Sequence, residues 1–171
     1  MSKKNLASFA IVLIFILISY HFLTARLAIA PAQQAVKIDN IKSVNIAGQN
    51  IKVELAVTEA EQELGLSGRS GLKEDEGMLF IFEQAGAHGF WMKDMNFPID
   101  IIWLNPARND FSIADAGGEN MKVVYIKKDA RPESYPEIYS SDKDSKYVLE
   151  VASGFSDKNG LKIGDEAKSI H

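Results

Sequence analysis

Two carboxylates lie inside otherwise apolar stretches of this 171-residue chain, where they could support chemistry. Asp100 lies in the run Ile99-Asp-Ile-Ile-Trp-Leu104, and Glu150 lies in Tyr147-Val-Leu-Glu-Val151. An ionised side chain in apolar surroundings needs a partner or a purpose, because its desolvation is costly. Asp100 and Glu150 are therefore candidate catalytic residues, which would act as general acid and base if the fold placed them in one pocket.

Cations and large apolar side chains form a second group of candidates. Trp91 and Met92 directly precede Lys93, and Arg69 follows a glycine-containing stretch. Polarisable side chains hold an apolar or sugar-like ligand by contact, and a nearby cation fixes an anionic group. We therefore predict a ligand-binding site made of Arg69, Trp91, Met92, Lys93 and Asp100.

Each carboxylate also has a structural interpretation. Asp100 would form an ion pair with Lys93 or Arg69, or cap loop amides at the turn 96–98, and Glu150 would face water if its strand is half-exposed. Side chains of a strand alternate between its two faces. The pattern therefore places Asp100 on one face with Ile102 and Leu104.

Several other chemistries find no support in the sequence. The three histidines, His21, His88 and His171, show no paired spacing, and cysteine is absent, so no metal site is expected. The glycines of 65–71 follow a predicted helix, whereas phosphate loops precede one. The same segment lacks the last glycine of a serine nucleophile elbow. No cofactor is expected.

Short elements must position these residues. A capping box of Thr58 and Glu61 predicts a helix from Glu59 to Leu66. Alternation and turn signals predict a hairpin of strands 43–47 and 51–56, further strands at 77–82, 98–104, 123–126 and 146–151, a helical turn or two within 153–159, and a closing turn with a short strand. Two long connections remain, at 105–121 and 127–146. We predict an α+β fold, a small, mainly antiparallel sheet or barrel-like domain with two short helices.

The N-terminal segment is typical of a membrane anchor. Residues 6–23 are almost wholly apolar, and as a helix they would be about 27 Å long, close to a hydrocarbon core of about 30 Å. Lys3 and Lys4 precede them, which favours a cytoplasmic N-terminus and a C-terminal domain outside the cytoplasm. The alternative is a secretory signal peptide cleaved after Ala32.

This interpretation divides the chain into three parts. Residues 1–30 form a cytoplasmic stub and transmembrane helix, 31–42 a linker, and 43–171 the folded domain. The expected location is the cell membrane, by a single pass, or the exterior if the chain is cleaved. The first 32 residues hold three of the 19 basic residues and none of the 23 acidic ones, so the remainder is strongly acidic and nucleic acid is not an expected partner.

Six motifs in order resemble those of the DUF192 family, also called UPF0127: Gly65-Leu66 with Arg69, Gly77-Met-Leu-Phe80, Phe90-Trp-Met-Lys93, Pro98-Ile-Asp-Ile101, Tyr147-Val-Leu-Glu150 and Gly160-Leu-Lys-Ile-Gly-Asp165. The resemblance covers residues 50–168 and implies a small α+β domain, in many members behind a signal peptide or anchor. It implies no particular reaction. Ser67 stands where the family commonly has Met, and the connection 105–121 is longer than the usual short turn.

Three functional hypotheses follow. The first is a membrane-anchored, extracytoplasmic module that binds a small molecule or an envelope component, or assists another protein there. The second is a hydrolase of envelope material that uses Asp100 and Glu150 as acid and base, with Arg69 or Lys93 stabilising an anion. The third is a structural protein-interaction module.

Overall fold

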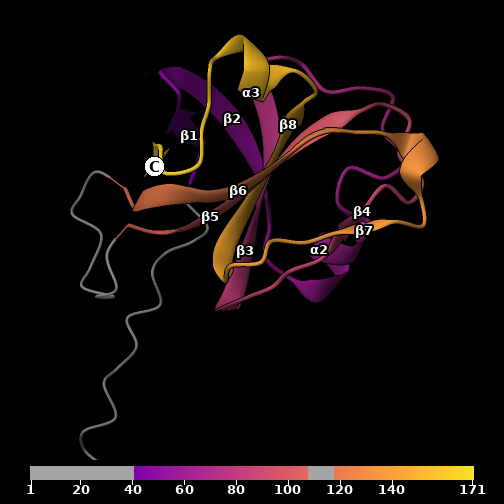
Figure 1. Ribbon diagram of the computed structural model, residues 1–171, viewed down its shortest axis with the longest axis horizontal. Coiled ribbons are helices and arrows are strands. Elements are labelled where there is room, and N and C mark those ends of the chain that lie inside the picture. Colours follow the sequence, from indigo (N-terminus) through magenta and orange to yellow (C-terminus); the bar gives the residue numbers. More distant parts are fainter. Residues whose placement is uncertain (1–40, 108–117) are drawn as a thin grey trace, which may run out of the picture. The chain divides into compact units, whose positions relative to one another are not determined.

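Seven strands close into a barrel in the computed structural model, which describes residues 41–107 and 118–171 (Figure 1). Around the barrel the strands follow the order β1, β2, β3, β8, β5, β6 and β9. Two further strands, β4 and β7, form a separate ribbon. The bounds are β1 Ser43–Ile46, β2 Gln49–Ala56, β3 Glu76–Gly86, β4 Phe90–Trp91, β5 Ile99–Pro106, β6 Asn120–Ala130, β7 Ile138–Tyr139, β8 Ser145–Ala152 and β9 Glu166–Ile170.

The strand pairs are antiparallel except for β2 with β3. A parallel pair needs a crossover, and helix α2, Glu59–Leu64, lies in the connection between these two strands. A second short helix, α3, spans Phe155–Lys158, and a 3₁₀ turn spans Pro132–Ser134. The prediction of a small, mainly antiparallel, barrel-like domain with two short helices is confirmed.

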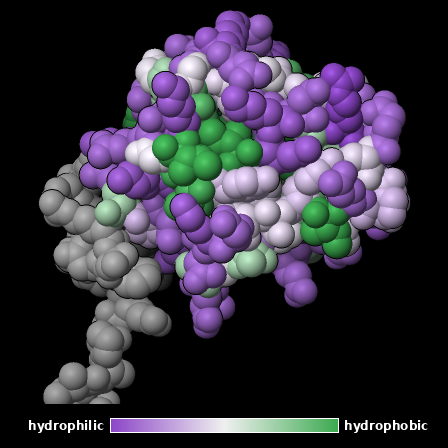
Figure 2. All heavy atoms as spheres, in the orientation of Figure 1, coloured by the Kyte–Doolittle hydropathy of each residue, from purple (hydrophilic) through white to green (hydrophobic). Residues whose placement is uncertain are grey.

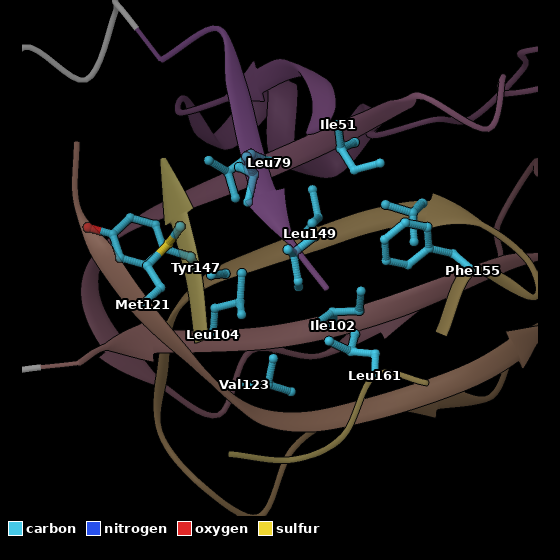
Figure 3. Close-up of a cluster of buried hydrophobic side chains, with 14 of the residues drawn as sticks. Ile51, Leu79, Ile102, Leu104, Met121, Val123, Tyr147, Leu149, Phe155 and Leu161 are labelled. Atoms are coloured by element: carbon cyan, nitrogen blue, oxygen red, sulfur yellow. The ribbon is translucent and has the colours of Figure 1, made fainter. Parts of the chain in front are cut away.

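Apolar side chains fill the interior of the barrel (Figure 3). Alternate residues of each strand point inward, so β5 contributes Ile102 and Leu104, and β8 contributes Leu149 and Val151. The helix α3 adds Phe155 at one end. This cluster accounts for one face of the strands only.

A second apolar cluster covers the outer face of β3, β5 and β8. Ile99, Ile101 and Trp103 of β5 belong to it, as the alternation predicted. Leu66, which follows α2, and Met92, which follows β4, cover it from outside. In Figure 1, α2 and the β4–β7 ribbon lie on the same side of the barrel. Both faces of β5 are therefore buried from Ile99 to Leu104, and Asp100 is buried with them.

Local signals set the first helix correctly, but its end and two connections differ from expectation. Thr58 and Glu61 form the predicted capping box, whereas α2 ends at Leu64, before Gly65 at the C-cap. Strand β6 begins at Asn120 and continues to Ala130, so both predicted long connections are shorter. The second one also contains the 3₁₀ turn and β7. Residues 108–117 lie outside the described part.

The predicted anchor at 6–23 and most of the predicted linker also lie outside the described residues. Across 41–107 and 118–171, no helix has the length and apolar character to cross a membrane. The face shown in Figure 2 is mostly hydrophilic, with apolar residues gathered in two separate patches. Among the exposed large apolar side chains are Trp91 and Ile138, which are paired across the β4–β7 ribbon.

Candidate functional site

The strand register places Glu150 in the middle of a row on the outer face of the barrel. Met78 of β3 lies beside Glu150 on one side, and Ile101 of β5 lies beside it on the other. Glu54 of β2 continues the row beyond Met78. Met78 and Ile101 both belong to the second apolar cluster, so the carboxyl of Glu150 is set among apolar side chains.

Glu150 is a buried acid without a complete set of partners. Only 5% of its surface is exposed, and its Oε2 atom has no hydrogen-bond partner. Burial raises the pKa of the Glu150 carboxyl from 4.5 to about 8, against a smaller lowering by the charge of Arg69. Glu150 is therefore mainly protonated at neutral pH. An unsatisfied buried group needs an explanation, and functional sites are where such groups concentrate.

Arg69 is the cation of this site, and Glu54 holds it in place. The Nη1 and Nη2 atoms of Arg69 donate to the two carboxylate oxygens of Glu54 at 2.5 and 2.8 Å. This bidentate pair lowers the pKa of Glu54 and raises that of Arg69, to which the charges of Glu150 and Glu76 add smaller effects. Arg69 thus has Glu54 as its ion-pair partner, and its charge also acts on the unpartnered Glu150.

Two loops meet beside Arg69, and we call residues 66–71 and 92–96 the covering loops. Three hydrogen bonds join them: Gly68 N–H to the carbonyl of Asp94 at 2.8 Å, the Ser67 hydroxyl to the carbonyl of Lys93 at 2.9 Å, and the Asn96 amide to the carbonyl of Arg69 at 2.9 Å. The side chain of Ser67 therefore contributes to this junction. The backbone of Arg69 is fixed by these contacts, while 33% of its side chain is exposed.

Asp100 lies on the other face of the sheet and has a different environment. Its carboxylate, which is 0% exposed, accepts from the backbone N–H groups of Asp129 at 2.9 Å, Gly154 at 3.3 Å and Ser156 at 2.8 Å. The group therefore ties the end of β6 to the start of α3. Capping loop amides was one of the structural interpretations, but the loops are these and not the turn at 96–98.

The structure brings together some of the predicted site residues and separates others. Arg69 and Met92 lie over the outer face that carries Glu150, whereas Asp100 points toward the interior side with Ile102. An acid and base that act on one substrate must reach one pocket. The expected joint use of Asp100 and Glu150 therefore has no geometric support here.

The three consecutive residues Trp91, Met92 and Lys93 point in different directions. Met92 is 1% exposed and packs in the second cluster, whereas Trp91 is 42% exposed on the ribbon. Lys93 is exposed and contributes its backbone carbonyl to the covering loops. Only Met92 and the Lys93 backbone therefore belong to the immediate surroundings of the site.

Glu54 was missed by the sequence analysis. The alternation of Ile51, Val53 and Leu55 shows that Glu54 faces outward, but this pattern is that of any half-exposed strand. Its partner, Arg69, follows a helix and lies 15 positions away. No local signal links the two.

Apart from the site around Glu150, the described residues form a surface depression but no group of metal ligands. Within 41–107 and 118–171 no group of three or more histidine, cysteine, aspartate or glutamate side chains is placed to hold a metal ion. A half-open depression of about 380 Å³ lies near α3, and its lining includes Glu74, Phe155 and Lys158. Glu74 and Lys158 form an ion pair at 2.7 Å within it. None of the predicted site residues lines this depression.

The buried carboxyl of Glu150 predicts a distinct pH dependence of stability. The folded state keeps the proton up to about pH 8, whereas the unfolded state releases it near 4.5, so this residue makes stability fall as pH rises between these values. The slope is at most about 1.4 kcal/mol per pH unit. Glu150→Gln should remove this dependence, and its stability relative to wild type should increase from pH 5 to pH 8.

Urea unfolding at several pH values measures this effect. Glu83→Gln, which changes an exposed carboxylate of β3, is the matched control and should follow the wild-type curve. Parallel curves for wild type and Glu150→Gln would show that Glu150 is ionised in the folded protein throughout this range.

Comparison with known proteins gives a family and a fold. Residues 42–169 match the model of the DUF192 family, described as "Uncharacterized ACR". A protein of unknown function from Novosphingobium aromaticivorans is 29% identical, with a TM-score of 0.64, over 75% of this chain and 84% of that one. A protein from Sinorhizobium meliloti, described as a candidate transcription regulator, is also 29% identical, with a TM-score of 0.60, over 74% and 90%. No curated protein matches the chain.

Proposed function

The chain belongs to the DUF192 family, and we propose that its domain is a ligand-binding module whose site is the outer face around Glu150 and Arg69. The observation that carries the proposal is the buried carboxyl of Glu150, which has an unpartnered oxygen beside a cation. A core with no function would gain stability from an apolar residue here, because an unsatisfied buried polar group costs about 1–3 kcal/mol. A ligand that completes this group explains its presence.

The covering loops and Arg69 supply access. Their mutual contacts are a few exposed hydrogen bonds, and the Arg69 side chain is held on one side only, by Glu54. Movement of Arg69 and the covering loops, which lie outside the barrel, would admit a ligand without disturbing the barrel interior. Met78 and Met92 belong to the apolar cluster around Glu150, and their flexible, polarisable side chains adapt to a ligand.

The sequence supports the place of action. The apolar segment 6–23 behind Lys3 and Lys4 would anchor the chain in the cell membrane by a single pass, with the domain outside the cytoplasm. The ligand is then a small molecule or an envelope component.

In membranes of the native host we expect the protein to retain residues 1–30. Recovery of a chain that begins at Gln33 would contradict the membrane anchor and show that the segment is a cleaved signal peptide.

A thermal-shift screen of the full-length chain tests binding. The compounds are amino acids, amino sugars, short peptides and simple saccharides, and the proteins are wild type, Arg69→Gln and the exposed-site control Asp142→Asn. We expect at least one class to raise the Tm of wild type and of Asp142→Asn but not of Arg69→Gln. Equal shifts in all three proteins, or none in any, would contradict a site at Arg69.

A protein-interaction module is the second candidate, and one observation favours it. Trp91 and Ile138 are 42% and 60% exposed and lie opposite each other on the β4–β7 ribbon. Exposed aromatic residues are common at the centre of protein interfaces. Loss of a binding partner in Trp91→Ala, with ligand binding at Arg69 unchanged, would assign function to this ribbon.

A further inference from the structure

The acids around Glu150 differ from it in one respect. Glu54 is paired with Arg69, and Glu76 is paired with Lys73 at 2.6 Å. Glu150 has no ion-pair partner of this kind, and its Oε2 has no hydrogen-bond partner. The group that a ligand could still pair with at this site is therefore the carboxyl of Glu150 and not a cation.

The ion pairs on this face disfavour an anionic ligand. Both terminal nitrogens of Arg69 are already used by Glu54, and the ammonium of Lys73 is used by Glu76. A ligand anion would have to displace one of these carboxylates. A ligand cation would instead meet the carboxyl of Glu150, which has no ion-pair partner of this kind.

The surroundings also restrict the kind of cation. The described residues hold no cluster of three acidic, histidine or cysteine side chains that could bind a metal ion. The neighbours of Glu150 in the register are Met78 and Ile101, and Leu66 and Met92 belong to the same apolar cluster. Such apolar neighbours suit an alkyl stem with one charged end.

We infer that the ligand presents to Glu150 a primary ammonium group on a short apolar stem, which donates a hydrogen bond to the free carboxylate oxygen. The inference rests on the proposed function and gives the chemical class of its ligand. The ammonium and the carboxylate form a charge-assisted hydrogen bond, which is about twice as strong as a neutral one. The oxygen that lacks a partner then has one.

Binding of this kind is linked to a proton. Glu150 must lose its proton, which passes to the solvent, before it can accept the ammonium, so the affinity should rise with pH up to about 8. The charged groups on the elements around Glu150 include Lys52 and Glu54 of β2, Glu76 and Glu83 of β3, Lys146 of β8, Arg69, Lys93 and Asp94 of the covering loops, and Lys127 of β6. Lys127 lies over the ring of Tyr139, with 4.3 Å between Nζ and the ring centroid.

The test follows the carboxyl carbon of Glu150 by NMR in full-length protein with ¹³C-labelled glutamate. The probes are n-butylammonium chloride, sodium butyrate and 1-butanol, which share a stem and differ in charge, at constant ionic strength set by potassium chloride. We expect n-butylammonium alone to lower the titration midpoint of Glu150, by about one pH unit at saturation, which corresponds to a tenfold effect. Glu150→Gln identifies the resonance and should lose the Tm increase that n-butylammonium gives wild type.

The outcomes separate this inference from the proposed function. A response of Glu150 to butyrate or butanol, but not to n-butylammonium, would overturn the ammonium inference and leave a ligand site in place. No response to any of the three would overturn the ammonium inference, and the screen with Arg69→Gln then decides the proposed function by itself.

Discussion

Asp100→Ala is expected to lower the free energy of unfolding by about 4 kcal/mol. The wild-type carboxylate accepts three backbone N–H groups, from Asp129, Gly154 and Ser156, and is fully buried. Alanine would leave these donors without this partner, and the N–H group of Ser156 is buried. It would also release the start of α3 from the barrel.

Chemical denaturation of three proteins measures the effect. Asp100→Asn keeps one carbonyl oxygen and the shape of the side chain, so its loss should be about half as large. Asp142→Ala changes an exposed aspartate and should be within about 0.5 kcal/mol of wild type. A loss below about 1 kcal/mol for Asp100→Ala would contradict its role as the link between β6 and α3.

Gly77→Ala is expected to cost about 3 kcal/mol, because β3 passes very close to β8 at this residue. A Cβ atom on Gly77 would lie 2.7 Å from the backbone carbonyl oxygen of Glu150 and 3.0 Å from a side-chain carbon of Ile51. The backbone carbonyl of Glu150 cannot move away from the new Cβ atom as easily as the end of a flexible side chain could. The two strands must therefore separate at the level of the proposed site.

Gly71→Ala is the matched control for this change. A Cβ atom there has no other atom within 4 Å, so its stability should equal that of wild type or exceed it by a few tenths of a kcal/mol. Thermal unfolding of both variants is sufficient. Equal Tm values for Gly77→Ala and Gly71→Ala would show that β3 and β8 are farther apart than the structure has them.

Features encoded within a few residues could be predicted from the sequence. The capping box of Thr58 and Glu61 set the start of α2, since all its groups lie within four positions. The alternation of β5 gave the two faces correctly, with Ile101 outside the barrel and Ile102 inside it. Periodicity fixes such faces without any knowledge of the partner strands.

Contacts between distant segments could not be predicted in this way. The three amides that Asp100 binds lie 29, 54 and 56 positions away. A carboxylate in an apolar strand indicates that polar partners exist, but the sequence does not identify them. Arg69 was one of two cations expected as partners of Asp100, but it pairs with Glu54. The parallel pairing of β2 with β3 places Glu54 in the row of Glu150.

The same limit explains the two candidate acids. Asp100 and Glu150 lie in two similar apolar strands, β5 and β8. The sequences of these strands do not show that the two side chains point to opposite faces of one sheet. That result depends on the register of β5 with β8, in which Ile101 and not Asp100 lies opposite Glu150. A shift by one residue would have brought both carboxylates to the same face.

The measurement that tests the site most directly is the pH titration of the Glu150 carboxyl carbon by NMR, without any ligand. We predict a midpoint of about 8 in wild type, because burial disfavours the charged form. In Arg69→Gln the midpoint should be higher still, since the guanidinium that lowers the pKa is gone. A midpoint near 4.5 in both proteins would show that Glu150 is solvated and that no buried acid awaits a ligand on this face.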